Sequence, residues 1–515
     1  MIETISCEGV AQLMASDGLF AVFDVRERGE YNDCQIPNTT SLPRSQIEFR
    51  LAELVPRGNI PIVVYDEGGQ RAGLAAQTFA QLGYEQVSIV DGGLSAWQSD
   101  GRETVSGVNV PSKAFGERVH HDRNVPDLSP EELKSLIDSA ADLMILDMRT
   151  PEEYGRFCIP GGLNVPGGEL IHWVEKLRQK PAVIVNCAGR TRSIIGAAAL
   201  QRLGLTNVRA LRNGTMGWVL AGYELENKPV RRGPAAPASD TQALTTALTI
   251  AAEEGLAAMT VEDLIRARAG ASYVIDVRSA EEFACDHVRG SINVPGGQAV
   301  QRADDFVPVR NAPIIFISKH SARAVMTAYW YRQMGFKNVF FLQGGLDAWT
   351  AAGQQLAIGA SSAEPQGFGG AKSAARLMDA AGLHDIIESA SSALIDVSTS
   401  LEYESSHIPG AKWISRGWID IKLPALYSDR AQSIVLTCRD GVLSVFAARQ
   451  LAEVGYSNVS VLEGGLRAWS AAGYRADSGL HDYLVPPNDV VLSPSIRGNK
   501  EDMQKYLDWE LKLKH

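Results

Sequence analysis

Short runs of consecutive apolar residues recur along the chain at regular intervals. Four of them end in or near an aspartate, and each is followed by an acidic residue next to an aromatic one: LFAVFDVR (19–26), LMILDMR (143–149), SYVIDVR (272–278) and SALIDVS (392–398). A second set follows, and each of its members leads into a helical stretch that ends at a glycine: PIVVYD, AVIVNC, PIIFIS and SIVLTC. Apolar runs without alternation are typical of strands buried on both faces. The pattern therefore predicts alternating strands and helices.

The spacing of these markers is that of an internal repeat. Four tryptophans close a G-G-x-x-A-W-like segment at intervals of 121, 131 and 120 residues: Trp97, Trp218, Trp349 and Trp469. The residues that end the second set of runs have the same intervals: Asp66, Cys187, Ser318 and Cys438. We therefore predict four α/β domains, each an open and mainly parallel sheet with helices on both faces. Their predicted ranges are 1–105, 122–228, 254–358 and 371–476, followed by a C-terminal extension over 477–515.

The connecting segments differ in composition. Residues 229–240 and 359–372 are rich in small residues and proline, which predicts flexible connectors. Segment 106–128 is less repetitive, and we expect it to pack against a neighbouring domain. Near the C-terminus, apolar residues recur every fourth position, which predicts a helix packed on the chain's own body: Met503, Leu507 and Leu511.

The amino-acid composition argues against some classes of function. The 515 residues carry a net charge of -11, which argues against a general nucleic-acid surface, although a local basic pocket is compatible with it. The apolar runs are too short to span a membrane, and the N-terminus does not have the pattern of a signal peptide. The cysteines are scattered, without a CxxC pair or a Cys/His cluster, which predicts a cytoplasmic protein without disulfides, metal or organic cofactor: Cys7, Cys34, Cys158, Cys187, Cys285 and Cys438.

The segment VIVNCAGRTRSIIG (183–196) places a cysteine between a predicted strand and a predicted helix. A short glycine-containing loop there can turn successive N–H groups inward to bind an anion, and the helix N-terminus adds its positive end. Arg190 and Arg192 add full charges, so we expect a lowered pKa for the Cys187 thiol. These features predict a nucleophilic cysteine that acts on an anionic substrate.

The chain resembles tandem rhodanese-type sulfurtransferases over nearly its whole length. The resemblance is carried by the D-V-R strand end, the segment EYESSHIPGA (402–411), the Cys-x4-Arg loop and the G-G-x-x-A-W end. It implies that Cys187 attacks the outer sulfur of thiosulfate or a related persulfide donor, holds that sulfur as a persulfide and passes it to cyanide, a thiol or a protein acceptor. It also implies that the loop binds the donor through Ala188, Gly189, Arg190, Thr191, Arg192 and Ser193.

Two other functions stay open. Tyrosine-phosphatase-like enzymes also use a cysteine in an arginine-bearing loop, but their loops resemble Cys-x5-Arg; the shorter loop here favours a single sulfur over a phosphoryl group. A persulfide carrier or docking scaffold without rapid turnover is the non-enzymatic alternative. Fast turnover with thiosulfate and cyanide would favour the enzyme, and stable loading would favour the carrier.

The sister loop CRDGVL (438–443) keeps its cysteine and resembles the loop of thiosulfate-preferring members of the same family. Cys438 is therefore a second candidate nucleophile, with Arg439 and Gly441 as candidate binding residues. Leu443 stands at the position of Arg192, the second arginine of the Cys187 loop. His407, in the same domain as Cys438, matches the histidine of the family's motif.

The other two loops have lost the nucleophile. In DEGGQR (66–71), we expect Asp66 to act as an internal anion that fills its own loop and faces Arg71. In SKHSAR (318–323), Ser318 is a poor nucleophile, and we expect His320 to face solvent rather than activate it. Both domains are therefore expected to be structural or regulatory.

The remaining candidates are expected to be structural. Cys158 could act as a relay thiol, but a buried packing role is favoured. Asp147, Arg149 and Glu153 are expected to form a buried polar network that braces their domain. The equivalent stretches of domains one and three hold two more cysteines that we expect to be structural: Cys34 and Cys285.

Overall fold

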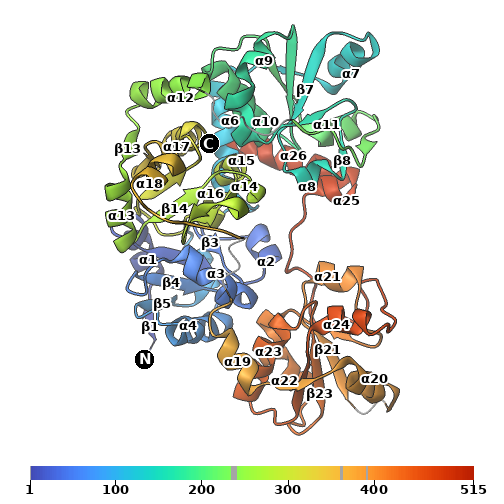
Figure 1. Cartoon of the computed structure of the whole chain (residues 1–515). Helices are drawn as coiled ribbons and strands as arrows, with labels where there is room; N and C mark the ends of the chain where they lie inside the picture. Colours follow the sequence, from blue (N-terminus) through green and yellow to red (C-terminus); the bar gives the residue numbers. More distant parts are fainter. Residues whose placement is uncertain (1, 234–240, 360–363, 390–391, 515) are drawn as a thin grey trace. The chain divides into compact units, whose positions relative to one another are not determined.

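The chain folds into two compact units. The first consists of Met1–Val108 and Ala363–Val491, and the second of Asn109–Ser362 and Leu492–His515. Repeats one and four thus form one unit, and repeats two and three form the other together with the end of the C-terminal extension (Figure 1). The computed structural model describes residues 2–233, 241–359, 364–389 and 392–514.

The first unit contains repeats one and four. Repeat one consists of β1 (Glu3–Ile5), α1 (Cys7–Met14), β2 (Ala21–Asp24), α2 (Arg28–Asp33), β3 (Thr40–Ser41), the 3-10 helix η1 (Arg44–Gln46), α3 (Ile47–Leu54), β4 (Ile62–Tyr65), α4 (Arg71–Gln81), β5 (Val87–Val90) and α5 (Gly93–Ser99). Repeat four consists of α19 (Phe368–Ala374), β20 (Arg376–Met378), α20 (Ala380–Ser389), β21 (Ala393–Asp396), α21 (Ser400–Ser405), β22 (Lys412–Trp413), η3 (Arg416–Trp418), α22 (Ile419–Leu426), β23 (Ile434–Thr437), α23 (Val442–Glu453), β24 (Val459–Leu462) and α24 (Gly465–Ala471).

The second unit contains repeats two and three and the C-terminal helices. Repeat two consists of α6 (Val110–Asp122), β6 (Asp127–Leu128), α7 (Pro130–Asp138), β7 (Leu143–Asp147), α8 (Pro151–Tyr154), β8 (Phe157–Cys158), β9 (Leu163–Asn164), η2 (Gly167–Trp173), α9 (Val174–Arg178), β10 (Ala182–Asn186), α10 (Thr191–Arg202), β11 (Val208–Leu211), α11 (Gly214–Leu220) and β12 (Glu226–Asn227). Repeat three consists of α12 (Thr241–Glu253), β13 (Ala257–Met259), α13 (Val261–Ala269), β14 (Tyr273–Asp276), α14 (Ala280–Cys285), β15 (His287–Val288), β16 (Ile292–Asn293), α15 (Gly296–Gln301), α16 (Ala303–Phe306), β17 (Ile314–Ile317), α17 (Ala322–Gln333), β18 (Val339–Leu342), α18 (Gly345–Ala351) and β19 (Leu356–Ala357). The chain ends with α25 (Pro494–Arg497), α26 (Lys500–Leu511) and η4 (Lys512–Lys514).

Each repeat contains one five-stranded sheet, and the strand order is the same in all four. The orders are β1-β5-β4-β2-β3, β6-β11-β10-β7-β9, β13-β18-β17-β14-β16 and β20-β24-β23-β21-β22, with every neighbour parallel. Every residue of β4, β17 and β23 is buried, as the unbroken apolar runs predict. Helices cover both faces of the sheets (Figure 1), which confirms the predicted α/β fold.

The recurring acidic–aromatic pair has a local explanation. In repeat two, Thr150 caps helix α8, and the Glu153 side chain reaches back to the Thr150 backbone N–H, which completes a capping box. The aromatic partner, Tyr154, is buried in the domain core. The same capping arrangement recurs in the other repeats with Glu30, Glu282 and Glu402.

The second glycine of the G-G-x-x-A-W end has a steric explanation. Gly214 has a φ of +54°, and a Cβ there would lie 2.2 Å from the carbonyl oxygen of Cys187. A side chain at this position would therefore push the loop that carries the cysteine. The equivalent glycines contact the equivalent carbonyls in the other repeats: Gly93, Gly345 and Gly465.

The segments between the domains differ from one another. Segment 106–128 contains α6, which packs against α10 of repeat two, and its Ser112 hydroxyl donates to the Gln301 carbonyl of repeat three. The expectation that this segment packs on a neighbouring domain is confirmed. The expectation of a flexible connector over 359–372 is wrong at its end, because α19 begins at Phe368; residues 360–363 and 234–240 lie outside the described residues. Within the described ranges, no helix has both the length and the apolar character to cross a membrane.

Candidate active site

Cys187 lies between β10 and α10, at the carboxyl end of its parallel sheet, where open α/β sheets bind ligands. Its Sγ is 3.4 Å from the Ser193 hydroxyl oxygen, and that hydroxyl donates to the Arg190 carbonyl at 2.8 Å. The loop therefore folds back over the thiol, which is 2% exposed.

The expected lowering of the Cys187 pKa is wrong for this closed arrangement. Burial has the largest effect and raises the pKa of the thiol above its usual 9.0, while the charge of Arg192 and hydrogen bonding with Ser193 lower it without cancelling that effect. The thiolate would therefore form more readily if water entered the loop.

Both loop arginines are already paired with glutamates. Arg190 makes two bonds to Glu117 of α6, at 2.5 and 2.8 Å, and a third to the Asn213 side chain at 3.1 Å. Arg192 makes two bonds to Glu153, at 2.6 and 2.8 Å. The cationic charge of the loop is thus largely neutralised, and the inward-facing backbone amides are left as its main anion-binding groups.

Arg192, the second arginine of the loop, forms an ion pair that also occurs in sister repeats. In repeats one and three, which lack the cysteine, Arg71 pairs with Glu30 and Arg323 pairs with Glu282. The Arg192–Glu153 pair is the same contact, because Glu153 is the equivalent capping glutamate. The expected polar network in repeat two therefore has two parts: the Arg192–Glu153 ion pair, and a buried bidentate pair between Asp147 and Arg149.

Two helices from outside the predicted domain cover the Cys187 loop. The first is α6, which supplies Glu117 to Arg190. The second is α26, whose Glu510 accepts a 2.6 Å hydrogen bond from the Thr191 hydroxyl. The C-terminal helix packs on the chain's own body, as predicted, through Met503 and Leu507, although Leu511 is exposed.

Sequence reasoning missed Glu117 and Glu510. They lie 73 and 319 positions from their loop partners, so only the folded chain brings them together. A partial signal existed for Glu510, because it lies three residues after Leu507 and so on the same face of α26.

The Cys438 loop has the same backbone plan but a different exposure. The Sγ of Cys438 lies 3.5 Å from the Ser444 hydroxyl oxygen, and burial raises the pKa of this thiol as well. Arg439 and Asp440 are exposed to solvent, unlike the corresponding residues of the Cys187 loop. Arg439 bonds to the capping glutamate Glu402 at 3.2 Å. In the other repeats the equivalent glutamate pairs with the arginine that Leu443 replaces here.

Asp66 fills its own loop, as expected. One carboxylate oxygen accepts backbone N–H bonds from Gly68 and Gly69 at 2.7 and 2.9 Å, and the other accepts from Ala72 at 3.0 Å. The expectation that it faces Arg71 is wrong, because that guanidinium pairs with Glu30 instead. Among the described residues, the hydrogen bonds to this carboxylate come from three backbone amides.

In repeat three, Ser318 is buried and its hydroxyl accepts an N–H bond from Ala324 at 3.2 Å. His320 lies 3.0 Å from Asp347 and is a quarter exposed, which agrees with an outward-facing histidine.

Of the other cysteines, Cys158 is fully buried with its pKa raised to about 11, first by burial and then by Glu226, which agrees with packing. Cys285 is exposed, so its expected structural role is wrong.

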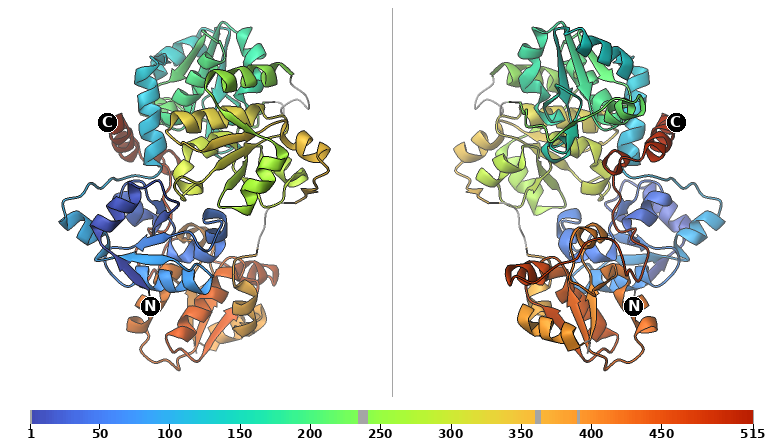
Figure 2. Two further views of the ribbon diagram at one scale, coloured as in Figure 1. Left: turned by 90° about the vertical axis from the view of Figure 1, so that its left-hand side faces the viewer. Right: turned by 90° about the vertical axis from the view of Figure 1, so that its right-hand side faces the viewer.

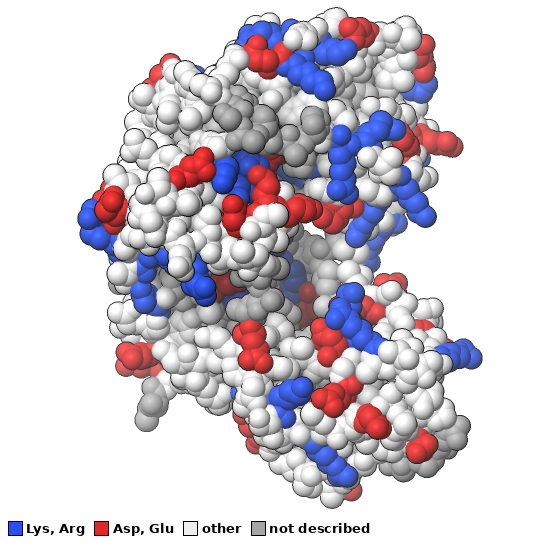
Figure 3. All heavy atoms as spheres, viewed as in Figure 1, with Lys and Arg blue, Asp and Glu red and all other residues white. Residues whose placement is uncertain are grey.

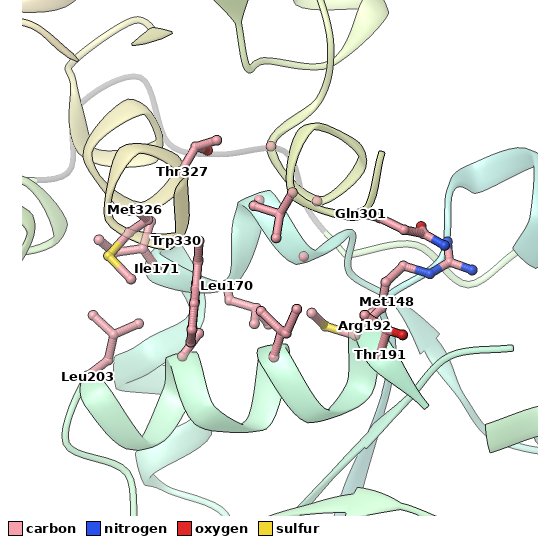
Figure 4. Close-up of a pocket in the computed structure, with 18 residues that line it drawn as sticks. Met148, Leu170, Ile171, Thr191, Arg192, Leu203, Gln301, Met326, Thr327 and Trp330 are labelled. Atoms are coloured by element: carbon pink, nitrogen blue, oxygen red, sulfur yellow. The ribbon is translucent and has the colours of Figure 1, made fainter. Parts of the chain in front are cut away.

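A separate cavity lies on the other side of α10. It encloses about 50 Å³ between α10, η2, α15 and α17 (Figure 4), and it is lined mainly by apolar side chains, including Met148, Leu170, Ile171, Leu203, Met326 and Trp330. Thr191 and Arg192 reach its end, but Cys187 does not line it. It has room for only a few water-sized molecules and is a packing gap between two repeats rather than the donor site.

The charged side chains on one face of the molecule are mixed in sign. On the face seen in Figure 3, acidic and basic side chains are interspersed rather than gathered in one basic field. Among the residues that the structure describes, no three His, Cys, Asp or Glu side chains are grouped to hold a metal ion.

Comparison with known proteins identifies the relatives of this architecture. The family description "Rhodanese-like domain" matches residues 6–100, 129–221, 260–352 and 379–472. The crystal structure of a thiosulfate sulfurtransferase from Pseudomonas aeruginosa is similar over 100% of this chain and 97% of that chain, with 36% identity and a TM-score of 0.91.

Curated sequences give shorter matches. A thiosulfate sulfurtransferase of Azotobacter vinelandii is 31% identical over 167 residues, which is 32% of this chain and 58% of that protein. One from Pseudomonas aeruginosa is 31% identical over 176 residues, which is 33% of this chain and 61% of that protein. The chain thus spans less than two thirds of the length of these curated relatives.

Proposed function

The chain belongs to the rhodanese-like domain family, and from this premise we propose that it is a sulfurtransferase with Cys187 as its nucleophile. The donor is thiosulfate or a related persulfide, and the acceptor is cyanide or a thiol. The six cysteines are free thiols, which supports work in a reducing, cytoplasmic compartment.

The observation that carries the proposal is the carboxylate of Asp66. It shows that three amides of this loop type bind an anion, namely those two, three and six positions after the strand end. The corresponding amides in repeat two belong to Gly189, Arg190 and Ser193. A persulfide on Cys187 would place its anionic outer sulfur in the same set of N–H groups.

The transfer proceeds in two balanced steps. The Cys187 thiolate attacks the outer sulfur of thiosulfate, an S–S bond forms, and the donor's S–S bond breaks with its electron pair leaving on sulfite. The acceptor then attacks the outer sulfur of the persulfide, which restores the Cys187 thiolate and yields thiocyanate from cyanide, or a persulfide from a thiolate. Neither step needs a metal or an organic cofactor.

Cys438 is proposed as a second site. Its sulfur has the Ser444 hydroxyl at the position that Ser193 has beside Cys187, and Gly441 opens the loop with a φ of +88°. Arg439 remains near the entrance, where its side chain is more than half exposed and available to a donor despite its bond to Glu402.

A persulfide carrier is the alternative that one observation favours. The backbone and side chains of residues 187–191 are all buried, and an enclosed persulfide would exchange slowly. The phosphatase-like alternative is disfavoured, because the guanidinium of Arg192 is bound to Glu153 rather than directed at a phosphoryl site.

The test is intact mass after thiosulfate treatment of the reduced protein. We expect the mass of one added sulfur atom in the unaltered protein and in Cys438→Ser, lost in Cys187→Ser. Turnover with thiosulfate and cyanide then separates the enzyme from the carrier. An adduct that survives Cys187→Ser and disappears in Cys438→Ser would overturn the assignment of the main site.

A further inference from the structure

The C-terminal helix α26 is attached to repeat two by an apolar contact. Met503 and Leu507 are buried and form a cluster with Met216 of α11, two residues after Gly214, the glycine that supports the Cys187 loop. Figure 2 shows the C-terminal end of the chain running alongside α6, and contacts between α26, η4 and α6 agree with that view. The helix is thus clamped between α11 and α6.

The face of α26 that meets the loop carries Tyr506 and Glu510. The space beside Gly189 is filled by this face: a Cβ on Gly189 would lie 2.9 Å from the Met216 methyl, 3.3 Å from Glu510 Oε2 and 3.5 Å from the Tyr506 ring. Thr191 donates to the other Glu510 oxygen at 2.6 Å. Because loop position 189 has no side chain, the helix can lie directly on the loop.

A buried cation completes the clamp. The ammonium of Lys113, on α6, lies 5.0 Å from the centre of the Tyr506 ring and 4.7 Å from that of Trp509. Such contacts favour the docked position of α26. Cys187, Ala188, Gly189, Arg190 and Thr191 are consequently all buried.

The docked state also contains an unfavourable element. Glu510 is 1% exposed, and its Oε2 has no hydrogen-bond partner among the described residues. Burial raises the pKa of this carboxyl, while Lys113 and the Thr191 hydroxyl lower it. An unpartnered buried oxygen weakens docking, so this contact is suited to opening and closing.

The Cys438 loop provides the comparison within the same chain. Its tip residues, Arg439 and Asp440, are exposed, so no described element covers them. The two loops share their backbone plan and their serine at the sixth position, and they differ in cover.

We propose that α26 is a lid that determines which substrates reach Cys187: Tyr506 and Glu510, held by Met503 and Leu507, admit small sulfur donors and acceptors and exclude thiols borne on macromolecules. This inference rests on the proposed function of Cys187. Entry of a donor the size of thiosulfate requires the two side chains to move, whereas a folded protein requires the helix to leave. Cys438 lacks such a filter.

The test measures alkylation of each cysteine in the full-length protein by peptide mass spectrometry. Iodoacetamide is the small reagent, and a maleimide on a polyethylene glycol chain is the large one. Leu507→Asp removes the apolar anchor, and Leu511→Asp is the matched control on the exposed face of the same helix. Exposed Cys285 reports unhindered reaction.

We expect the ratio of large-reagent to small-reagent rate to be lower at Cys187 than at Cys438. Leu507→Asp should raise the large-reagent rate at Cys187 by about tenfold or more, because a charged residue cannot occupy the buried site. Rates at Cys438 and Cys285 should stay within about twofold if the rest of the chain remains folded. Leu511→Asp should change none of them.

A second variant guards against misfolding by Leu507→Asp. Gly189→Ala places a methyl group against Met216 and Glu510 without altering α26, and it should increase labelling of Cys187 in the same direction. Equal rate ratios at Cys187 and Cys438 in the unaltered protein, or no response to either variant, would overturn the lid.

The labelling result does not depend on sulfur transfer. If Cys187 is gated but takes no sulfur from thiosulfate, the proposed function fails and the lid stands. If Cys187 takes sulfur but is equally open to both reagents, the lid fails and the function stands. Where both hold, Leu507→Asp should newly allow transfer from Cys187 to a thiol on a small folded protein, while transfer to cyanide is already present.

Discussion

Replacing Asp66 by asparagine should destabilise the first unit by about 2 kcal/mol. Asparagine keeps one oxygen, which can still accept from Gly68 and Gly69, but its amide nitrogen would face the N–H of Ala72. Leaving a buried N–H without an acceptor costs about 1–3 kcal/mol, and the two remaining bonds lose their charge assistance. Removal of a buried charge offsets part of this loss.

The assay is thermal unfolding with local hydrogen exchange. For a folded unit of this size, 1 kcal/mol corresponds to about 2–4 °C, so the melting temperature should fall by about 4–8 °C. The amides of Gly68, Gly69 and Ala72 should lose protection. Asp33→Asn, at an exposed carboxylate in the same repeat, is the control and should have little effect.

An unchanged melting temperature together with unchanged protection of those amides would refute the reasoning. It would mean that the loop amides do not bind the carboxylate with useful energy. The proposed anion-binding role of the Cys187 loop would then lose its main support, because it relies on the equivalent amides.

Two further predictions concern the Arg192–Glu153 pair of repeat two and the Asp66 loop of repeat one. Burial tends to raise the pKa of Glu153, but Arg192 outweighs burial and lowers that pKa to about 2 from its usual 4.5. The pair therefore adds about 3 kcal/mol to the free energy of unfolding above pH 4.5, and this contribution is lost as the pH falls toward 2. Denaturant unfolding over this range should show the loss in the unaltered protein and in the control Glu152→Gln but not in Glu153→Gln, and parallel curves for all three would contradict it. Asp66→Cys should place a thiol among the three amides of repeat one, and in a Cys187→Ser, Cys438→Ser background it should restore uptake of one sulfur atom from thiosulfate; absence of uptake in the folded triple variant would show that the amides alone do not suffice.

The four repeats and the type of loop that follows each second strand could be predicted from the sequence because their signals are local. Apolar runs predict the buried strands, and the register of Asp66 with Cys187 predicts a carboxylate in an amide-lined loop. The roles of the arginines could not be predicted in this way. The sequence places Arg71 in the same loop as Asp66, so we expected the two side chains to face each other. Arg71 instead reaches Glu30, which lies 41 positions away and becomes its neighbour only in the folded chain.

The covering of Cys187 by α26 could not be predicted from the sequence either. The spacing of Met503 and Leu507 predicts a helix that packs on the chain, but it does not say on which of four similar domains. The choice is made by tertiary contacts: Met216 offers an apolar partner, and Gly189 leaves space for Glu510. Burial by that helix also explains why the thiol pKa moves up rather than down.

The pairing of repeat one with repeat four has a consequence for how the chain is made. Arg44 of the first repeat bonds to Asp420 of the last, 376 positions later. At about 5–20 residues per second, the ribosome needs roughly 20–75 s to supply that partner, during which the matching surface of repeat one stays uncovered. Repeats two and three can meet sooner, and α26 is made after all four repeats. Until α26 has been made, the thiol of Cys187 remains uncovered by its helix, so on the proposed lid the nascent chain is open to protein-borne thiols that the folded protein would exclude.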